Sequence, residues 1–367
     1  MKKSLFVTVL IALVMACGTF FTLMAYDNKS NEEIESEMAS GVVLVQNQSY
    51  YEIDIPGRKP IYFSGFDDEG NIEGRTEDKG AVKQVLFYGT GFFISNKGQI
   101  ATNMHVVNSK LDDEDVQKIK TNFTSYYASE KKRIMARREE ASYDYDCLAT
   151  TCAYGIIYDD MSFSDLMGYS EEAVQLQAKM DDYDKKISDL ENINMADAEI
   201  KCHVKISIAY NDSHVTSTED FIPCVVTKKD MEHDLAIIEL KDRTTPESKH
   251  VFEVPAEDPL ENYGFHDKIT KTLSNDKNSL LHMAGFNYGP LVDVTQSSLK
   301  SQFNTGTISQ NTDDRLMYSI QVLCGSSGSP VVNRSGELVA INHAGLAESQ
   351  GFNYGIKVKH LRNLMDQ

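Results

Sequence analysis

The chain contains the sequence Gly-Ser-Ser-Gly-Ser-Pro at residues 325–330. A serine hydroxyl becomes a useful nucleophile only when a neighbouring base removes its proton. Acyl transfer also needs backbone N–H donors aimed at the oxyanion that develops. A tight glycine-containing turn can expose Ser327 and direct its N–H, with that of Gly325, toward one point. The stretch therefore predicts Ser327 as a nucleophile and the N–H groups of Gly325 and Ser327 as an oxyanion hole.

The turn differs from the nucleophile turn of lipases. That turn has the form Gly-x-Ser-x-Gly, whereas Ser329 occupies the last position here. In the lipase class the histidine also comes last, but the candidate histidine and aspartate of this chain precede Ser327. The order His-Asp-Ser disfavours an α/β-hydrolase. An esterase that uses the same three residues on small substrates remains an alternative.

His105 and Asp234 are the candidate partners of Ser327. His105 follows a predicted β-hairpin, from which an imidazole can overhang a cleft. Asp234 directly precedes the apolar run Leu-Ala-Ile-Ile at 235–238. A half-buried carboxylate there can fix the tautomer of the imidazole and stabilise the imidazolium. An ordinary surface histidine and a strand-capping aspartate are the alternatives for each residue alone.

Most of the chain outside residues 109–198 has a β-type pattern. Short apolar runs alternate with turn residues, which is typical of β-barrels or a sandwich. A short helix is predicted at 358–365. The predicted strands include 42–45, 85–88, 91–94, 99–102, 204–208, 224–226, 235–238, 281–285, 304–309, 318–321, 331–332, 338–341 and 354–356.

Three ordered motifs resemble the trypsin-like serine proteases, especially the bacterial HtrA-type enzymes and the glutamyl endopeptidases. The first is Gly-Thr-Gly-Phe at 89–92 followed by Thr-Asn-Met-His-Val at 102–106. The second is Asp-Leu-Ala-Ile at 234–237, and the third is the Gly-Ser-Ser-Gly-Ser-Pro turn at 325–330. The sequence at 331–341 also resembles HtrA-type proteins.

The resemblance covers residues 41–108 and 199–367. It implies a mostly β fold, with two perpendicular six-stranded barrels of the chymotrypsin type. A long α-helical hairpin insertion and a C-terminal helix complete the expected fold. The family assigns His105 as general base, Asp234 as its orienting partner and Ser327 as nucleophile. It implies a serine endopeptidase acting on proteins or peptides, without a cofactor.

The sequence departs from the family in three places. Ser326 replaces the usual Asn or Asp before the nucleophile, and the PDZ domain of HtrA-type enzymes has no counterpart. The helical insertion at 109–198 also lies outside the family core, and we consider it a possible partner site. A non-catalytic adaptor that binds through this insertion is the alternative function.

The resemblance also indicates a substrate-binding region. Glutamyl endopeptidases carry a histidine that recognises acidic side chains. Counting from Ser327, that position is Asn342, and His343 lies one residue later. Since neighbouring side chains of a strand face opposite sides, His343 is expected to face either Asp234 or the substrate pocket. The predicted substrate-binding residues are Gln321, Asn342, His343, Ala344, Gly345 and Gly355.

The insertion has a helical pattern. Apolar residues recur at steps of three and four, as on one face of an amphipathic helix. They are Ala173, Leu176, Met180, Tyr183, Ile187 and Leu190, with a weaker set at Val116, Ile119, Phe123 and Tyr126. Two such helices joined by a cysteine-containing loop predict an antiparallel hairpin. Cys147 and Cys152 could form a disulfide in that loop or remain free thiols.

The N-terminus predicts export. Lys2 and Lys3 precede an apolar run that extends to about residue 25, and a polar linker is expected at 27–40. Three fates are compatible with residues 1–26: a cleaved signal peptide, an uncleaved membrane anchor, or lipidation at Cys17. We expect the protein in the periplasm or at the cell surface.

Composition excludes other classes of function. The net charge of −19 disfavours nucleic acid as a partner, because phosphate binding needs a basic surface. The hydrophobic fraction of 41% is sufficient for a globular core. No CxxC pair or HExxH motif is present, so the sequence predicts no metal site.

Overall fold

A computed structural model describes residues 29–67, 71–108, 111, 113–158, 161–260, 280–289, 298–345 and 353–367. It divides the chain into two compact units. The first comprises the described residues within 1–49, 85–108 and 204–367, and the second those within 50–84 and 109–203. The predicted anchor, including Cys17, lies outside the described residues. No helix among the described residues is long and apolar enough to span a bilayer.

The first barrel has six strands, which pair in the order β1-β5-β6-β9-β8-β7 and close through a pairing between β1 and β7. Strand β9 is buried at every position, which places the residue before it at the edge of a packed core. The strands are β1 (Val42–Asp54), β5 (Val85–Phe93), β6 (Gln99–Asn103), β7 (Glu199–Tyr210), β8 (Ile222–Asp230) and β9 (Leu235–Leu240).

The second barrel is closed and has the order β10-β11-β12-β15-β14-β13. Its strands are β10 (Leu280–Gly285), β11 (Gln302–Asn311), β12 (Arg315–Tyr318), β13 (Pro330–Asn333), β14 (Leu338–Gly345) and β15 (Asn353–Lys357). The two six-stranded antiparallel barrels confirm the predicted chymotrypsin-like fold. The predicted C-terminal helix is also present, as α8 (Val358–Asp366).

Residues 27–40 were expected to be a polar linker, but most of them form the helix α2 (Asn31–Gly41). Ser30 and Glu33 form a capping box that pairs backbone N–H groups at the start of the helix. Ile34 and Met38 are buried on its inner face. The glutamates that suggested a linker are the residues that flank this apolar pair along the helix.

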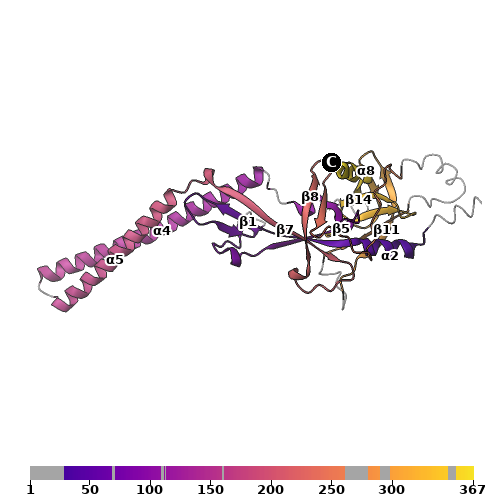
Figure 1. The fold of residues 1–367 in the computed structure, drawn as a ribbon. Coiled ribbons are helices and arrows are strands. Elements are labelled where there is room, and N and C mark those ends of the chain that lie inside the picture. Colours follow the sequence, from indigo (N-terminus) through magenta and orange to yellow (C-terminus); the bar gives the residue numbers. More distant parts are fainter. Residues whose placement is uncertain are drawn as a thin grey trace, which may run out of the picture. The chain divides into compact units, whose positions relative to one another are not determined.

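The second unit contains the helical hairpin of α4 (Asp113–Ile157) and α5 (Phe163–Glu191), which run side by side in Figure 1. The predicted seam of α5 is confirmed, since Leu176 and Met180 are buried together with Ala141 of α4. The predicted cysteine-containing loop was wrong, because Cys147 and Cys152 lie inside α4, where both are free thiols.

Short elements complete this unit. Residues 50–84, which the sequence assigned to the protease domain, cluster here with the helices. Their apolar side chains form a core with Ile119 and Phe123 of α4. The elements are β2 (Ile61–Phe63), β3 (Gly65–Phe66), β4 (Ile72–Glu73), η1 (Lys79–Ala81) and η2 (Met195–Asp197).

Candidate active site

The pairing of β6 with β9 brings the predicted histidine and aspartate together. Asn103, the last residue of β6, lies opposite Leu235, the first residue of β9. His105 follows in the short helix α3 (Met104–Val107), and Asp234 ends the turn before β9. The N–H of Met104 donates to the backbone carbonyl of Asp234 at 3.0 Å, which fixes the two segments to each other.

Asp234 holds His105 at two atoms. Its Oδ1 accepts the backbone N–H of His105 at 2.8 Å, and its Oδ2 lies 2.6 Å from the ring Nδ1. An ionised carboxylate only accepts hydrogen bonds, so Nδ1 carries the proton and Nε2 keeps its lone pair. This is the tautomer that a general base needs. Asp234 has a left-handed backbone, with φ of 54°.

His343 is a second imidazole on the same carboxylate. Its Nε2 lies 3.0 Å from Oδ2 of Asp234, in agreement with the alternative in which His343 faces this aspartate. Burial by itself would raise the pKa of Asp234, but hydrogen bonds from His105 and His343 outweigh it. The pKa of this carboxyl is therefore held well below its usual range. The ring of His343 also stacks on Tyr354, with centroids 4.9 Å apart.

The turn that carries Ser327 has two glycines in the left-handed region. Gly325 has φ of 95° and Gly328 has φ of 87°. A Cβ on Gly328 would lie 2.1 Å from the carbonyl oxygen of Thr90, so only glycine fits. Thr90 holds the turn on both sides: its hydroxyl donates to the Gly325 carbonyl at 2.9 Å, and its N–H donates to the Ser327 carbonyl at 2.8 Å.

The hydroxyl of Ser327 donates to the backbone carbonyl of His343 at 2.9 Å. It makes no hydrogen bond to His105 among the described residues, although both residues belong to the same compact unit. The N–H groups of Gly325 and Ser327 have no hydrogen-bond acceptor within the described part of the chain. These are the two donors that the sequence assigned to an oxyanion hole.

The predicted substrate-binding residues have different surroundings. Asn342 is fully buried; its amide donates to the Ser326 carbonyl at 2.9 Å, and its Oδ1 accepts the Tyr318 hydroxyl at 2.7 Å. A Cβ on Gly355 would lie 3.1 Å from that hydroxyl. Asn342 and Gly355 therefore surround Tyr318, and Asn342 supports the turn before Ser327.

The other predicted substrate-binding residues lie on a loop and on strand β14. Gln321 is exposed in the loop after β12. Ala344 and Gly345 pair with Tyr354 and Asn353 across the β14–β15 ladder. Their backbone thus belongs to the second barrel at the strand that carries His343.

The sequence did not indicate several neighbours of this site. Phe87 is 46% exposed and meets the His105 ring edge-on, with centroids 6.4 Å apart. Tyr354 supports His343, and Thr90 holds the serine turn. Thr90 belongs to the quoted Gly-Thr-Gly-Phe motif, which was the one available signal. The contacts of Phe87 and Tyr354 depend on how strands distant in sequence pair within each barrel. Such contacts produce no recognisable local pattern in the sequence.

The donor atoms of His105, Asp234 and His343 lie within 4.8 Å of one another, close enough to bind one cation. Two imidazoles and a carboxylate suit a borderline divalent ion such as Zn²⁺. The same contacts also suffice for a histidine held by a carboxylate, so this cluster needs no ion to account for its geometry.

A family model described as the trypsin-like peptidase domain matches residues 194–341. Over these residues the chain is similar to trypsin-like peptidases. The matched segment includes Asp234 and Ser327, while His105 precedes it. No curated protein matches the sequence.

Among solved structures, the chain is similar to the serine endoprotease from Yersinia pestis at 15% identity and a TM-score of 0.42. The alignment covers 92% of this chain and 66% of that one, slightly less than two thirds of its length.

Proposed function

We propose that the protein is a serine endopeptidase with Ser327 as nucleophile, His105 as general base and Asp234 as its orienting partner. One observation carries the proposal. Asp234 fixes His105 at two atoms, 2.8 and 2.6 Å away, in the tautomer that leaves Nε2 as an acceptor. The glycine turn of Ser327 supports it, because the N–H groups of Gly325 and Ser327 have no acceptor among the described residues.

The chemistry follows from these groups. Nε2 of His105 removes the proton of the Ser327 hydroxyl as the oxygen attacks the peptide carbonyl. The oxyanion that forms accepts hydrogen bonds from the N–H groups of Gly325 and Ser327. His105 then gives the proton to the departing amine, which leaves an acyl-enzyme. Water deprotonated by His105 releases the acid and restores the serine.

The hydroxyl of Ser327 must turn before it can react. It donates to the His343 carbonyl at 2.9 Å, and attack requires it to donate to His105 instead. A rotation about χ1 between staggered wells makes this exchange without moving the backbone. We propose that a bound substrate shifts the hydroxyl toward His105.

Labelling with a fluorophosphonate probe tests the activity. The wild-type chain should label, and Ser327→Ala and His105→Ala should not, while circular dichroism shows both variants folded. Cleavage of a denatured protein would then separate a peptidase from an esterase of small substrates. A folded wild-type chain that never labels, with its N-terminal segment present in membranes, contradicts the proposal.

The exposed end of the helical hairpin favours a second candidate function, an adaptor that binds a partner. Four large apolar side chains are more than half exposed there: Ile156, Ile157, Tyr158 and Phe163. These side chains flank the connection between α4 and α5, and a group of exposed large apolar side chains in one region commonly marks an interaction site. Two results together would favour the adaptor. The wild-type chain would fail to label, and a bound partner would be lost when Ile157 and Phe163 are replaced with serine.

We also propose that the protein is exported to the periplasm or cell surface, on the basis of Lys2, Lys3 and the apolar run after them. Fractionation with and without residues 1–26 tests this. Incorporation of labelled fatty acid that Cys17→Ala abolishes would identify lipidation among the three fates. Equal distribution of both chains in the cytosolic fraction would contradict export.

A further inference from the structure

A second cluster of histidines and carboxylates lies in the first compact unit, and none of its residues is hydrogen-bonded to Ser327 among the described residues. His233 belongs to the turn between β8 and β9, His360 to the first turn of α8, and Asp314 to the hairpin between β11 and β12. Their donor atoms all lie within 4.8 Å of one another. Three distant segments of the chain thus supply three potential metal ligands.

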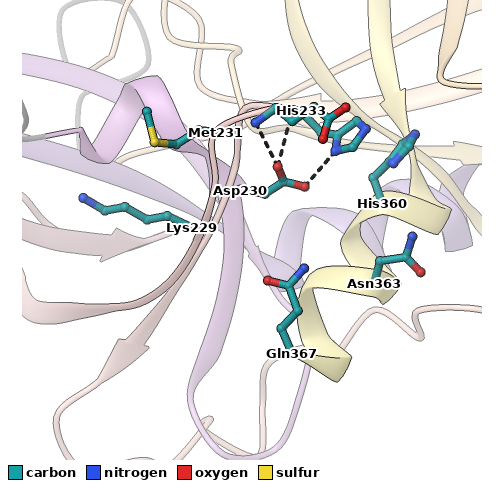
Figure 2. Close-up of a pocket in the computed structure, with 8 residues that line it drawn as sticks. Lys229, Asp230, Met231, His233, His360, Asn363 and Gln367 are labelled. Carbon is teal, nitrogen blue, oxygen red and sulfur yellow. Dashed lines mark hydrogen bonds and ion pairs between the residues drawn. The ribbon is translucent and has the colours of Figure 1, made fainter. Parts of the chain in front are cut away.

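Asp230 orients one of these ligands. Its Oδ2 lies 2.8 Å from Nδ1 of His233, and its Oδ1 accepts the N–H groups of Glu232 and His233. Figure 2 shows these bonds converging on Asp230. Since the carboxylate accepts the Nδ1 proton, Nε2 of His233 keeps its lone pair. A carboxylate behind a histidine is the usual outer partner of a metal-binding imidazole.

His360 and Asp314 are already at a suitable separation. Nε2 of His360 lies 3.1 Å from Oδ1 of Asp314. Two ligands with bonds of about 2.0 Å to a tetrahedral zinc ion lie about 3.3 Å apart.

The two imidazoles stack on each other, with ring centroids 3.7 Å apart and planes inclined by 21°. A metal ion lies close to the plane of each imidazole that binds it, so the rings must tilt apart when they share an ion. Asp314 is 63% exposed and can follow such a movement. Its other partner, the Lys359 ammonium at 3.4 Å, would be displaced by the ion.

Access is provided by a hollow of about 380 Å³ that His233 and His360 line together with Lys229, Asn363 and Gln367 (Figure 2). It offers room for a water molecule as a further ligand. Two imidazoles and one carboxylate prefer Zn²⁺ and its neighbours to the hard ions Ca²⁺ and Mg²⁺.

We propose that His233, His360 and Asp314 bind a borderline divalent transition-metal ion, with Asp230 as the outer partner of His233. The bound ion would connect α8 and the β11–β12 hairpin to the turn that ends at Asp234. The proposal does not depend on proteolytic activity, because none of its ligands belongs to the proposed catalytic residues.

The test uses the full chain with His105→Gln, which removes the other histidine cluster from consideration. Equilibrium dialysis with Zn²⁺ should give one ion per chain, and Co²⁺ should give the visible absorption of a site with nitrogen and oxygen ligands. His360→Gln and His233→Gln should each weaken binding at least tenfold. Asn363→Ala, which lines the hollow but removes no ligand, should leave binding unchanged.

Asp314→Asn changes an exposed side chain without changing its shape, so this variant should fold. It keeps the test interpretable if a histidine variant misfolds. It should also weaken Zn²⁺ binding about tenfold, with an unchanged circular dichroism spectrum. Failure of the His105→Gln chain to bind Zn²⁺ would overturn the proposal. Equal binding by folded His233→Gln, His360→Gln and Asp314→Asn variants would overturn it as well.

Discussion

Nε2 of His343 lies 3.0 Å from Oδ2 of Asp234, the same oxygen that lies 2.6 Å from Nδ1 of His105. One carboxylate oxygen therefore has two imidazole partners. The backbone carbonyl of His343 also accepts the hydroxyl of Ser327. His343 is thus in contact with two of the three proposed catalytic residues, and we predict that it acts through them as a positioning residue.

Replacing His343 with alanine should lower the rate of fluorophosphonate labelling about 10- to 100-fold. Asp234 would lose one hydrogen bond to a charged group, which typically contributes about 1.5–3 kcal/mol. His343→Gln, whose amide can still donate, should recover part of the rate. Tyr354→Phe keeps the ring stacked on His343 and should label at the wild-type rate. Unchanged labelling of His343→Ala would exclude the positioning role.

Gly328→Ala should abolish labelling. The new Cβ would lie 2.1 Å from the Thr90 carbonyl, at a backbone φ of 87°. A residue forced into this region costs about 1–3 kcal/mol before the clash is counted. The Ser327 turn must therefore shift, which moves the N–H groups of Gly325 and Ser327, the proposed oxyanion donors, out of position. Thermal unfolding and labelling rates measure both effects.

Gly168→Ala is the matched control for that change. Gly168 lies within α5, and a Cβ there meets nothing within 4 Å. Alanine in a helix interior is favoured over glycine by about 1 kcal/mol. This variant should therefore be slightly more stable than the wild type and label normally. A Gly328→Ala chain as stable and reactive as Gly168→Ala would contradict the strained-turn interpretation.

The β-rich character of the chain could be predicted because alternating apolar residues and turn residues are local signals. The arrangement in two barrels and the roles of His105, Asp234 and Ser327 were predicted from the resemblance of three short motifs to the trypsin-like proteases. Strand alternation left two orientations for the side chain of His343, toward Asp234 or toward the substrate pocket. The structure shows the first. The helical seam was predicted by its spacing in the same way.

Features that depend on distant pairings could not be predicted. Tyr318 occupies the space between Asn342 and Gly355 because β12, β14 and β15 are neighbours in the barrel. The cluster of His233, Asp314 and His360 joins three segments with no motif in common. Helix α2 was missed because its two buried side chains are outnumbered by glutamates.

Cys224 should resist alkylation in the folded protein. Burial raises the pKa of its thiol to about 12, so only about one molecule in 10⁴ is a thiolate at pH 8. Cys147 and Cys324 are exposed free thiols and should react quickly with iodoacetamide. Mass spectrometry of peptides after a timed reaction separates these sites. In urea Cys224 should react like the others; equal rates in the folded chain would contradict its burial.

The contribution of Asp234 to stability should disappear in acid. Its pKa in the folded protein lies below that of the unfolded chain, because hydrogen bonds from His105 and His343 outweigh the effect of burial. The unfolded chain therefore binds more protons, and stability from this group is full above about pH 4. It is lost as the pH falls further, toward the folded pKa.

Asp234→Asn removes this titration while keeping the shape of the side chain. The difference in urea midpoint between wild type and Asp234→Asn should be constant from pH 7 to pH 5 and shrink below about pH 4. Asp242→Asn, at an exposed turn in the same unit, is the control and should show little difference at any pH. A wild-type advantage that grows on acidification would mean that the carboxyl pKa is raised, opposite to the effect expected from its two imidazole partners.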